Sequence, residues 1–408
     1  MDRQVNQAAP RIMHIDLNSC FATVSQQAHP HLRGKPLVIA AYTTDRGCIL
    51  ASSIEAKKLG IKTGMMVYQA RTICPEVIVR ENDPDLVRDV SSNFMKICGD
   101  YSPDVTPKSI DEIVINFAAT GGYHKKTLVE IGREIKDRFH REIGEWIFCN
   151  IGISTNRFLA KLASSLHKPD GLDVIDHRNL MSIYSSVKLT DLNGINVRYE
   201  ARLNRVGIFN PTQFFYATDA ALRKQVFGGI VGHYWYMRLR GWEVDDFKSE
   251  RKSYGQEYSL GKKTNDPQRL AALIMMLTEK MGRRLRSSNR AAKGVHLAFL
   301  YDDWSYWHRG RKFDQSMYTT QELYQKIMGL SAECRSTRIV RKIAVSCFGL
   351  TTFDSITPSL FDDESEKMRR VSNAVDLIND RYGEYVVTPA IMIKAKKTIV
   401  DRIAFGGL

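Results

Sequence analysis

The chain has 408 residues, in which 59 Lys and Arg stand against 45 Asp and Glu for a formal net charge of +14. At about 100–200 residues per domain, this length predicts two to four domains and excludes a single small module. Hydrophobic residues at 43% and charged residues at 25% exclude extensive disorder and fibrous classes. The positive charge predicts a polyanionic partner, either nucleic acid or an anionic membrane surface.

Seven cysteines lie far apart, without a CxxC pair or a His at zinc-ligand spacing. We therefore expect reduced thiols in a cytoplasmic protein. The N-terminus lacks the apolar core of a signal peptide, and no run of about 18 apolar residues occurs. Neither secretion nor a membrane partner is expected, which leaves nucleic acid as the favoured polyanion.

The N-terminal part of the chain alternates strands and helices. An apolar run at 11–17 predicts a strand that ends near Asp16, and cap-type residues precede a helix that starts near residue 20. Residues 35–42 predict a second strand, and residues 52–59 a short helix with its glycine just beyond the end.

Two adjacent acids stand in the next expected strand, a β-branched stretch at 105–117. Asp111 shares a face with the apolar residues of this stretch. Glu112 points to the other face or, if the chain turns between the two acids, both converge on one site. An amphipathic helix over 121–146 and a strand over 148–153 continue the alternation.

The remaining chain changes character twice. Residues 187–241 predict short helical hairpins joined by glycine turns. An α+β unit of two αβ halves follows, with helices over 270–285 and 319–333 and strands over 295–300 and 342–350.

Most of the positive charge lies in that last unit. Residues 251–352 hold 19 basic and 8 acidic residues, a net charge of +11. Residues 351–366 predict a linker, and residues 367–408 have the composition of a helix followed by strands.

Asp16, Asp111 and Glu112 are three carboxylates that can meet at one edge of a sheet. Carboxylate oxygens are the ligands that Mg²⁺ prefers, and two such ions can activate a hydroxyl and hold a triphosphate. The alternative is that these acids are solvated turn residues, and their place inside apolar strands argues against it.

Several motifs in order resemble the Y-family of translesion DNA polymerases. They are HIDLNSCFATV from His14, GKPLVIA from Gly34, SIDE at 109–112, GISTNRFLAKLASSLHKPDG at 152–171 and the glycine turns at 192–208. The resemblance runs from about residue 11 to residue 350. Within the family the chain is similar to the polymerase IV subgroup and to the catalytic subunit of polymerase V. Asn18 is the residue that resembles the polymerase V sequence.

The resemblance implies an α+β multidomain fold, a right-hand polymerase with a ferredoxin-like palm, small fingers, a helix-hairpin-helix thumb and an α+β little finger. The expected divisions are palm 1–25 and 85–180, fingers 26–84, thumb 181–248, little finger 249–352, and a linker with C-terminal tail 353–408.

The resemblance also implies the catalytic site. Asp16, Asp111 and Glu112 fall on the catalytic metal-binding carboxylates, and the backbone carbonyl of Leu17 falls on the remaining protein ligand. Two Mg²⁺ ions are the implied cofactors, with Mn²⁺ as a substitute.

The implied nucleotide contacts include Phe21, the aromatic steric gate against a ribose 2′-hydroxyl, with Cys20 beside it. Lys168 falls on the lysine that approaches the triphosphate. Ile54 and Lys57 stand where the family usually has a tyrosine and an arginine, so we expect weaker nucleotide binding than in a typical relative. The alternatives are a core role for Phe21 and a solvated loop position for Lys168.

The implied DNA contacts lie in two segments. Gly194, Asn196 and Gly207 fall on a helix-hairpin-helix that holds a DNA phosphate, with Asn196 in place of a second glycine. An ordinary helical hairpin is the alternative. In the family, the little finger grips the DNA backbones. A dense basic group and a basic loop are the matching residues here: Arg283, Arg284, Arg286, Arg290 and Lys293, then Arg309, Arg311 and Lys312. A solvated basic face is the alternative for both groups.

Ser359, Leu360 and Phe361 resemble the short peptide with which bacterial polymerases bind the sliding clamp. The leading Gln of that peptide is missing here. The alternative is a linker that touches its own domain.

Together these residues predict a template-directed DNA polymerase that adds dNTPs to the primer 3′-hydroxyl of primer-template DNA. The family implies lesion tolerance in DNA repair, low fidelity and no proofreading. Two rivals stay open, a catalytically weak DNA-binding accessory protein of the same shape and a nucleotidyl cyclase with a similar palm.

Overall fold

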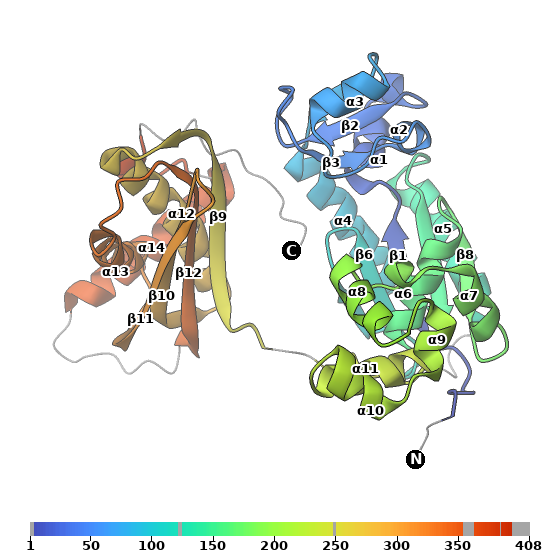
Figure 1. Cartoon of the computed structure of the whole chain (residues 1–408). Helices are drawn as coiled ribbons and strands as arrows, with labels where there is room; N and C mark the ends of the chain where they lie inside the picture. The colour runs from blue at the N-terminus through green and yellow to red at the C-terminus, as the bar shows by residue number, and fades with distance from the viewer. Residues whose placement is uncertain (1–3, 121–124, 248–249, 354–362, 384, 394–408) are drawn as a thin grey trace. The chain divides into compact units, whose positions relative to one another are not determined.

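The computed structural model describes residues 4–120, 125–247, 250–353, 363–383 and 385–393 (Figure 1). The chain divides after Phe247 into two compact units. The finer division of the first unit into palm, fingers and thumb stays a prediction. Among the described residues, none of the helices is long and apolar enough to cross a lipid bilayer.

A five-stranded sheet forms the centre of the first unit, in the order β5-β6-β1-β7-β8. Its middle strand β1 (Ile12–Leu17) pairs antiparallel with β6 (Glu112–Asn116) and with β7 (Cys149–Ser154). β5 (Val105–Pro107) and β8 (Leu172–Ile175) are its edges. The strands expected at 11–17 and 148–153 are confirmed as β1 and β7. Glu112 is the first residue of β6, and Asp111 comes just before it.

Helices cover both faces of this sheet. α1 (Cys20–Ala28), α4 (Pro84–Gly99) and α5 (Leu128–Arg138) close the main hydrophobic core against one face. α6 (Arg157–Leu166) contacts β1 and β7 from the other face. The sheet is therefore a rigid base for any side chain at its strand ends.

Gly152 lets α6 approach β7 more closely than any side chain would allow. A Cβ on Gly152 would lie 2.0 Å from the carbonyl oxygen of Ala160 and 2.3 Å from the nitrogen of Ser164. Both atoms belong to the helix backbone, which cannot move aside as a flexible side chain can.

A second, three-stranded sheet lies between α1 and α4 in the sequence and has a small core of its own. The strand expected at 35–42 and the helix expected at 52–59 are confirmed here, although both are shorter. Its elements are η1 (Pro30–Leu32), β2 (Leu37–Ala40), β3 (Ile49–Ser52), α2 (Ile54–Lys58), α3 (Val67–Ile73) and β4 (Ile78–Glu81).

Short helices complete the first unit around a core that contains Trp235. Glycine turns join them, as the sequence predicts. They are α7 (Leu180–Ser186), η3 (Leu189–Asp191), α8 (Val197–Arg205), α9 (Pro211–Tyr216), α10 (Asp219–Ala221), η4 (Leu222–Val226) and α11 (Ile230–Leu239).

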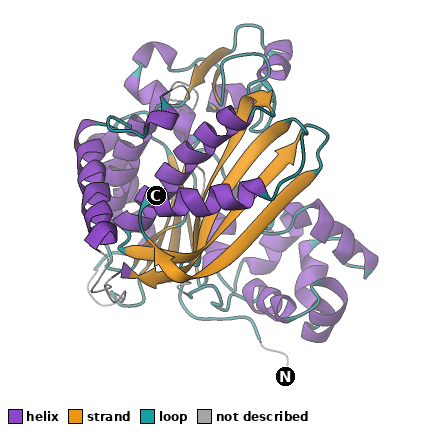
Figure 2. Cartoon of the chain, turned by 90° about the vertical axis from the view of Figure 1, so that its left-hand side faces the viewer, coloured by secondary structure: helices purple, strands orange, loops and turns teal. Residues whose placement is uncertain are grey.

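The second unit is a four-stranded antiparallel sheet in the order β11-β10-β12-β9, and Figure 2 shows its long strands with helices across one face. The two predicted αβ halves are confirmed. The elements are β9 (Ser253–Thr264), α12 (Pro267–Ser287), β10 (Arg290–Tyr301), β11 (Tyr306–Met317), α13 (Thr320–Ala332), β12 (Val340–Thr352), α14 (Asp363–Tyr382) and η6 (Ala390–Met392).

Three sequence-based boundaries are wrong. The helix expected from residue 121 begins at Leu128, because Thr127 caps it with a reciprocal Glu130 bond, and after Arg138 it continues as the π-helical turn η2 (Phe139–Ile143). The basic loop expected near 309–312 is part of strand β11. The linker expected to residue 366 gives way to α14 from Asp363, and of the described residues after it only η6 is regular structure, without strands.

Replacing Gly152 with alanine should destabilise the first unit. The added Cβ must push α6 away from β7, which we expect to lower the free energy of unfolding by about 1–3 kcal/mol. Chemical denaturation of the two proteins measures the difference. Gly99→Ala is the matched control, because no atom lies within 4 Å of a Cβ there and alanine is favoured in a helix. Equal stability of Gly152→Ala and wild type would contradict the close contact.

Candidate active site

Three carboxylates meet where β1 ends and β6 begins. Asp16 lies opposite Glu112 in the strand register, and Asp111 immediately precedes β6. The Leu17 N–H donates to the Asp111 carbonyl oxygen at 2.9 Å, which ties the hairpin turn to the end of β1. Asp111 lies in the bend just before β6, near enough to Asp16 and Glu112 for their negative charges to act on it.

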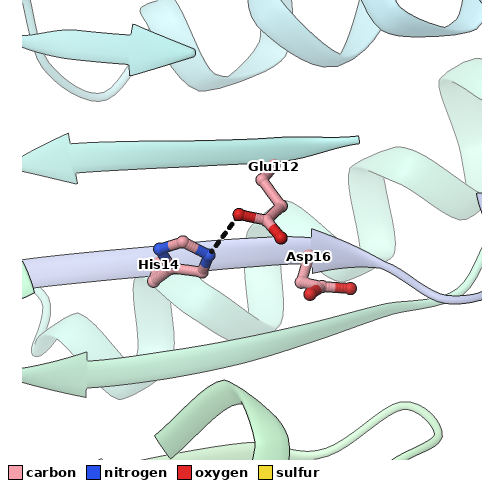
Figure 3. A group of neighbouring side chains, drawn as sticks. All are labelled: His14, Asp16 and Glu112. Carbon is pink, nitrogen blue, oxygen red and sulfur yellow. Dashed lines mark ion pairs between the residues drawn. The ribbon is translucent and has the colours of Figure 1, made fainter. Parts of the chain in front are cut away.

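Figure 3 shows His14 and Asp16 on β1 beside Glu112 on the neighbouring strand. One ligand atom from each of the three lies within 4.8 Å of the other two, a spacing at which a metal ion could be held. His14 is absent from the sequence-based site. Its signal was its position two residues before Asp16, because alternate residues of a strand share a face.

The neighbouring acids make the charged form of Asp111 less stable. Burial, and then the negative charges of Asp16 and Glu112, raise the pKa of Asp111, while a 2.5 Å hydrogen bond from the Ser109 hydroxyl works in the opposite direction. A cation beside these acids would relieve the repulsion.

Glu112 is held in its charged form by two side chains. Burial raises its pKa, but hydrogen bonds from His14 and Lys161 outweigh burial and lower the pKa of Glu112 to about 2. The Lys161 ammonium on α6 lies 2.6 Å from Oε2, whereas His14 Nε2 lies 3.5 Å from the same oxygen, the outer limit of a hydrogen bond. Lys161 is therefore the stronger partner, and the sequence reasoning missed it.

A cavity of about 480 Å³ opens over Asp16 and Asp111. This volume suits a ligand of nucleotide size. Apolar side chains line one part of it and lysines another. The lining side chains include Phe21, Ile54, Lys57, Lys58 and Lys168.

The lysines give the cavity an anion-binding character. Lys168 Nζ lies 3.0 Å from Asp16 Oδ2. Burial, and then the charge of Lys168, lower the pKa of Lys57, while Asp16 raises it. Two cations that face one cavity and repel each other are stabilised by a bound anion.

Phe21 and Cys20 form the start of α1 beside these groups. Both are buried, at 3% and 4% exposure, and both line the cavity. Burial, and then Asp111 and Asp16, raise the pKa of the Cys20 thiol, which keeps it neutral and unreactive. The sequence-based placement of both residues beside a ligand stays a prediction.

In the expected phosphate-binding turn, Asn196 stands in place of a second glycine but does not adopt a glycine-like conformation. Asn196 is not left-handed: its φ is −98°, and its side chain caps α8 by accepting the N–H groups of Arg198 and Tyr199. Those N–H groups are therefore already occupied. Gly194 and Gly207 do adopt positive φ, at 99° and 81°.

The arginines of α12 that were expected to form a basic face have different surroundings in the structure. Arg286 has a side chain only 3% exposed, bonded through two nitrogens to Asp376 of α14, so burial argues against a DNA contact there. Arg283 pairs with Asp380 of the same helix. Arg284 lies over the Tyr254 ring.

The expected DNA-binding residues on strands β10 and β11 also differ in their surroundings. Arg309 and Arg311 both pair with Glu333 at the end of α13. Arg290 and Lys293 lie on β10, and Lys312 lies on β11. The clamp-binding residues Ser359, Leu360 and Phe361 lie outside the described residues.

Known families match this chain over most of its length. The impB/mucB/samB family matches residues 15–165, and the C-terminal domain of the same family matches residues 251–360. A DNA polymerase IV of Pelotomaculum thermopropionicum is 30% identical over 397 residues, which cover 96% of this chain and 97% of that protein. One of Staphylococcus aureus is 31% identical over 70% of this chain and 79% of its own length.

Solved structures give the same fold. A Y-family DNA polymerase chimera of Dbh and Dpo4 covers 83% of this chain and 98% of its own, with a TM-score of 0.70 at 23% identity. An insertion ternary complex of Dbh DNA polymerase has a TM-score of 0.60 at 22% identity. With the carboxylates at one sheet edge and this length of match, the chain belongs to the impB/mucB/samB family, the Y-family of translesion DNA polymerases.

Proposed function

We propose that this chain is a translesion DNA polymerase that joins a dNTP to a primer 3′-hydroxyl under template direction and releases pyrophosphate. The observation that carries the proposal is the gathering of Asp16, Asp111 and Glu112 at the end of β1 and the start of β6, where Asp16 and Asp111 line a cavity together with lysines. Family membership supports the same activity, with low fidelity and without proofreading. DNA and a nucleotide are the substrates, and the enzyme uses divalent metal.

The donor set fits a hard divalent cation, and we propose Mg²⁺, with Mn²⁺ able to substitute. Asp16, Asp111, Glu112 and the Leu17 carbonyl oxygen would hold it, and the raised pKa of Asp111 indicates negative charge that a cation would neutralise. When bound, such ions lower the pKa of the attacking hydroxyl and neutralise the triphosphate.

The chain's own residues would do the remaining work. Lys168 and Lys57 both line the cavity and would hold the phosphates, which would bring the α-phosphate near the carboxylates. Phe21 would fill the space beside the sugar. Lys161 would fix the orientation of Glu112 through its 2.6 Å bond.

The rival functions have less support. An inactive accessory protein has no need of Asp16 and Glu112 at metal-ligand spacing with Asp111 beside them. A nucleotidyl cyclase has no template to hold, and the second unit matches the C-terminal domain of the polymerase family. Binding to a sliding clamp through Ser359, Leu360 and Phe361 stays a proposal that rests on the sequence motif.

Neutralising the paired acids should abolish primer extension. Asp111→Asn with Glu112→Gln removes two charged ligands, and a loss of several kcal/mol of transition-state stabilisation corresponds to about a 10³-fold slower rate. A gel-based extension assay measures it, with DNA affinity by anisotropy expected to change by less than about 2-fold. Asp104→Asn is the control, because Asp104 bonds Asn116 at the far end of β6. Extension at the wild-type rate in the double variant would refute the site.

Phe21→Ala should admit ribonucleotides. Removing the ring opens space for a 2′-hydroxyl, and we expect the preference for dNTP over rNTP to fall about 100-fold, equivalent to about 2.7 kcal/mol. Steady-state kinetics with both nucleotides measure the ratio. If Phe21 is only a core residue, Phe21→Ala lowers Tm and both activities while the ratio stays constant.

Ile54→Tyr should strengthen nucleotide binding. A tyrosine hydroxyl at this cavity position can donate to a charged phosphate, a hydrogen bond of about 1.5 kcal/mol, or roughly 10-fold in KM. Ile54→Phe supplies the ring without the hydroxyl and should leave the KM near that of wild type. An unchanged or higher KM in Ile54→Tyr counts against the predicted defect.

A further inference from the structure

The loop that carries Lys168 is held by two buried amides. It joins α6 to β8 and runs from His167 to Gly171. The Lys168 side chain is 41% exposed, so the position of its ammonium depends on where the loop places its backbone. A flexible lysine contacts a small target reliably only if its Cα is placed well.

Asn18 and Asn150 bond to that loop at two backbone groups. Asn18 Oδ1 accepts the Asp170 N–H at 2.8 Å, and Asn150 Nδ2 donates to the His167 carbonyl oxygen at 3.0 Å. A third bond joins the two amides, from Asn18 Nδ2 to Asn150 Oδ1 at 2.9 Å.

The backbone groups fix the orientation of both amides. A backbone N–H can only donate and a carbonyl oxygen can only accept, so Asn18 must present its oxygen to Asp170 and Asn150 its nitrogen to His167. The remaining nitrogen of Asn18 and oxygen of Asn150 then match each other. A flip of either amide would break two bonds, so the arrangement has one stable form.

The arrangement is buried and has little room to change. Asn18 is 4% exposed and Asn150 is 0% exposed, so an unpaired polar group there would cost about 1–3 kcal/mol. A Cβ on Gly171 would lie 2.2 Å from the His167 carbonyl oxygen. The loop is therefore closed tightly on the same carbonyl that Asn150 holds.

The same two residues lie close to Asp16, Asn150 on the neighbouring strand β7 and Asn18 just after β1 ends. Asn150 lies opposite Asp16 in the β1–β7 register, and Asn18 follows Asp16 by two residues. A fixed path of three hydrogen bonds thus joins the strand end that carries Asp16 to the loop that brings Lys168 within 3.0 Å of it.

We propose that Asn18 and Asn150 are positioning residues that set the distance between Lys168 and Asp16, and so determine how tightly the site binds a nucleoside triphosphate. This inference rests on the proposed polymerase function.

Nucleotide KM and kcat in primer extension test the proposal, with Asn18→Ala, Lys168→Ala and the double variant. Asn18→Ala should raise the KM for dNTP about 10-fold and lower kcat less than about 3-fold, because the binding of the phosphates is affected first. In the Lys168→Ala background the same change should alter KM less than about 2-fold. Effects that multiply, or a wild-type KM in Asn18→Ala, would overturn the proposal.

Asn116→Ala is the matched control. Asn116 lies in the same sheet and also accepts a backbone N–H, from Ala118, and donates to a neighbour, Asp104. Its removal should leave nucleotide KM unchanged. An equal rise in KM there would mean that any lost amide in this sheet has the effect, against the proposal.

Hydrogen exchange gives a readout that does not depend on activity. The Asp170 amide should exchange at least about 10-fold faster in Asn18→Ala than in wild type, and an equal rate would overturn the proposal. If Asn18→Ala does not fold, Asn150→Ser takes its place with the same expected rise in KM, and failure of both to fold would make the amides structural only. Wild-type protein without extension activity refutes the polymerase function, whereas an active wild type with an insensitive Asn18→Ala refutes this inference alone.

Discussion

The repulsion among three carboxylates, at the end of strand β1 and the start of strand β6, is the constraint on which the site of the first unit depends. Asp16, Asp111 and Glu112 are brought together by strand pairing, at the cost of a raised pKa for Asp111. Each lysine nearby offsets part of that charge, Lys161 at Glu112 and Lys168 at Asp16. Cations on α6 and on the loop that follows it thus pair with two of the three acids.

Positive charge has two different uses in this chain. In the first unit, a few lysines point into one cavity and suit phosphate groups. In the second unit, several arginines that the sequence suggested for DNA stabilise the fold, since Arg286 is buried against Asp376 and Arg283 pairs with Asp380. Helix α14 thereby belongs to the second unit, with Met392 beyond it buried in the same core. Net charge alone does not distinguish these uses.

Sequence patterns predicted most of the elements and the three acids proposed for catalysis, because each prediction rests on local periodicity or on an ordered motif. They failed where the decisive partner is distant in the sequence. Lys161 is one of several lysines in the chain until α6 packs on β1 and β7 and brings it to Glu112. His14 is an ordinary strand residue until Glu112 is placed beside it. Strand β11 was missed because its exposed, polar residues lack the usual alternation.

The sequence alone determined the family, the right-hand class of fold, the three acids and the concentration of charge after residue 250, since motifs and composition do not depend on which elements touch. Only the tertiary structure decided which side of the chain each charge faces. It placed Asp111 beside Asp16 and Glu112, assigned Arg286 to the interior, and joined Asn18 to the Lys168 loop across 152 residues of chain. Such pairings depend on backbone positions set by packing, and no local pattern records them.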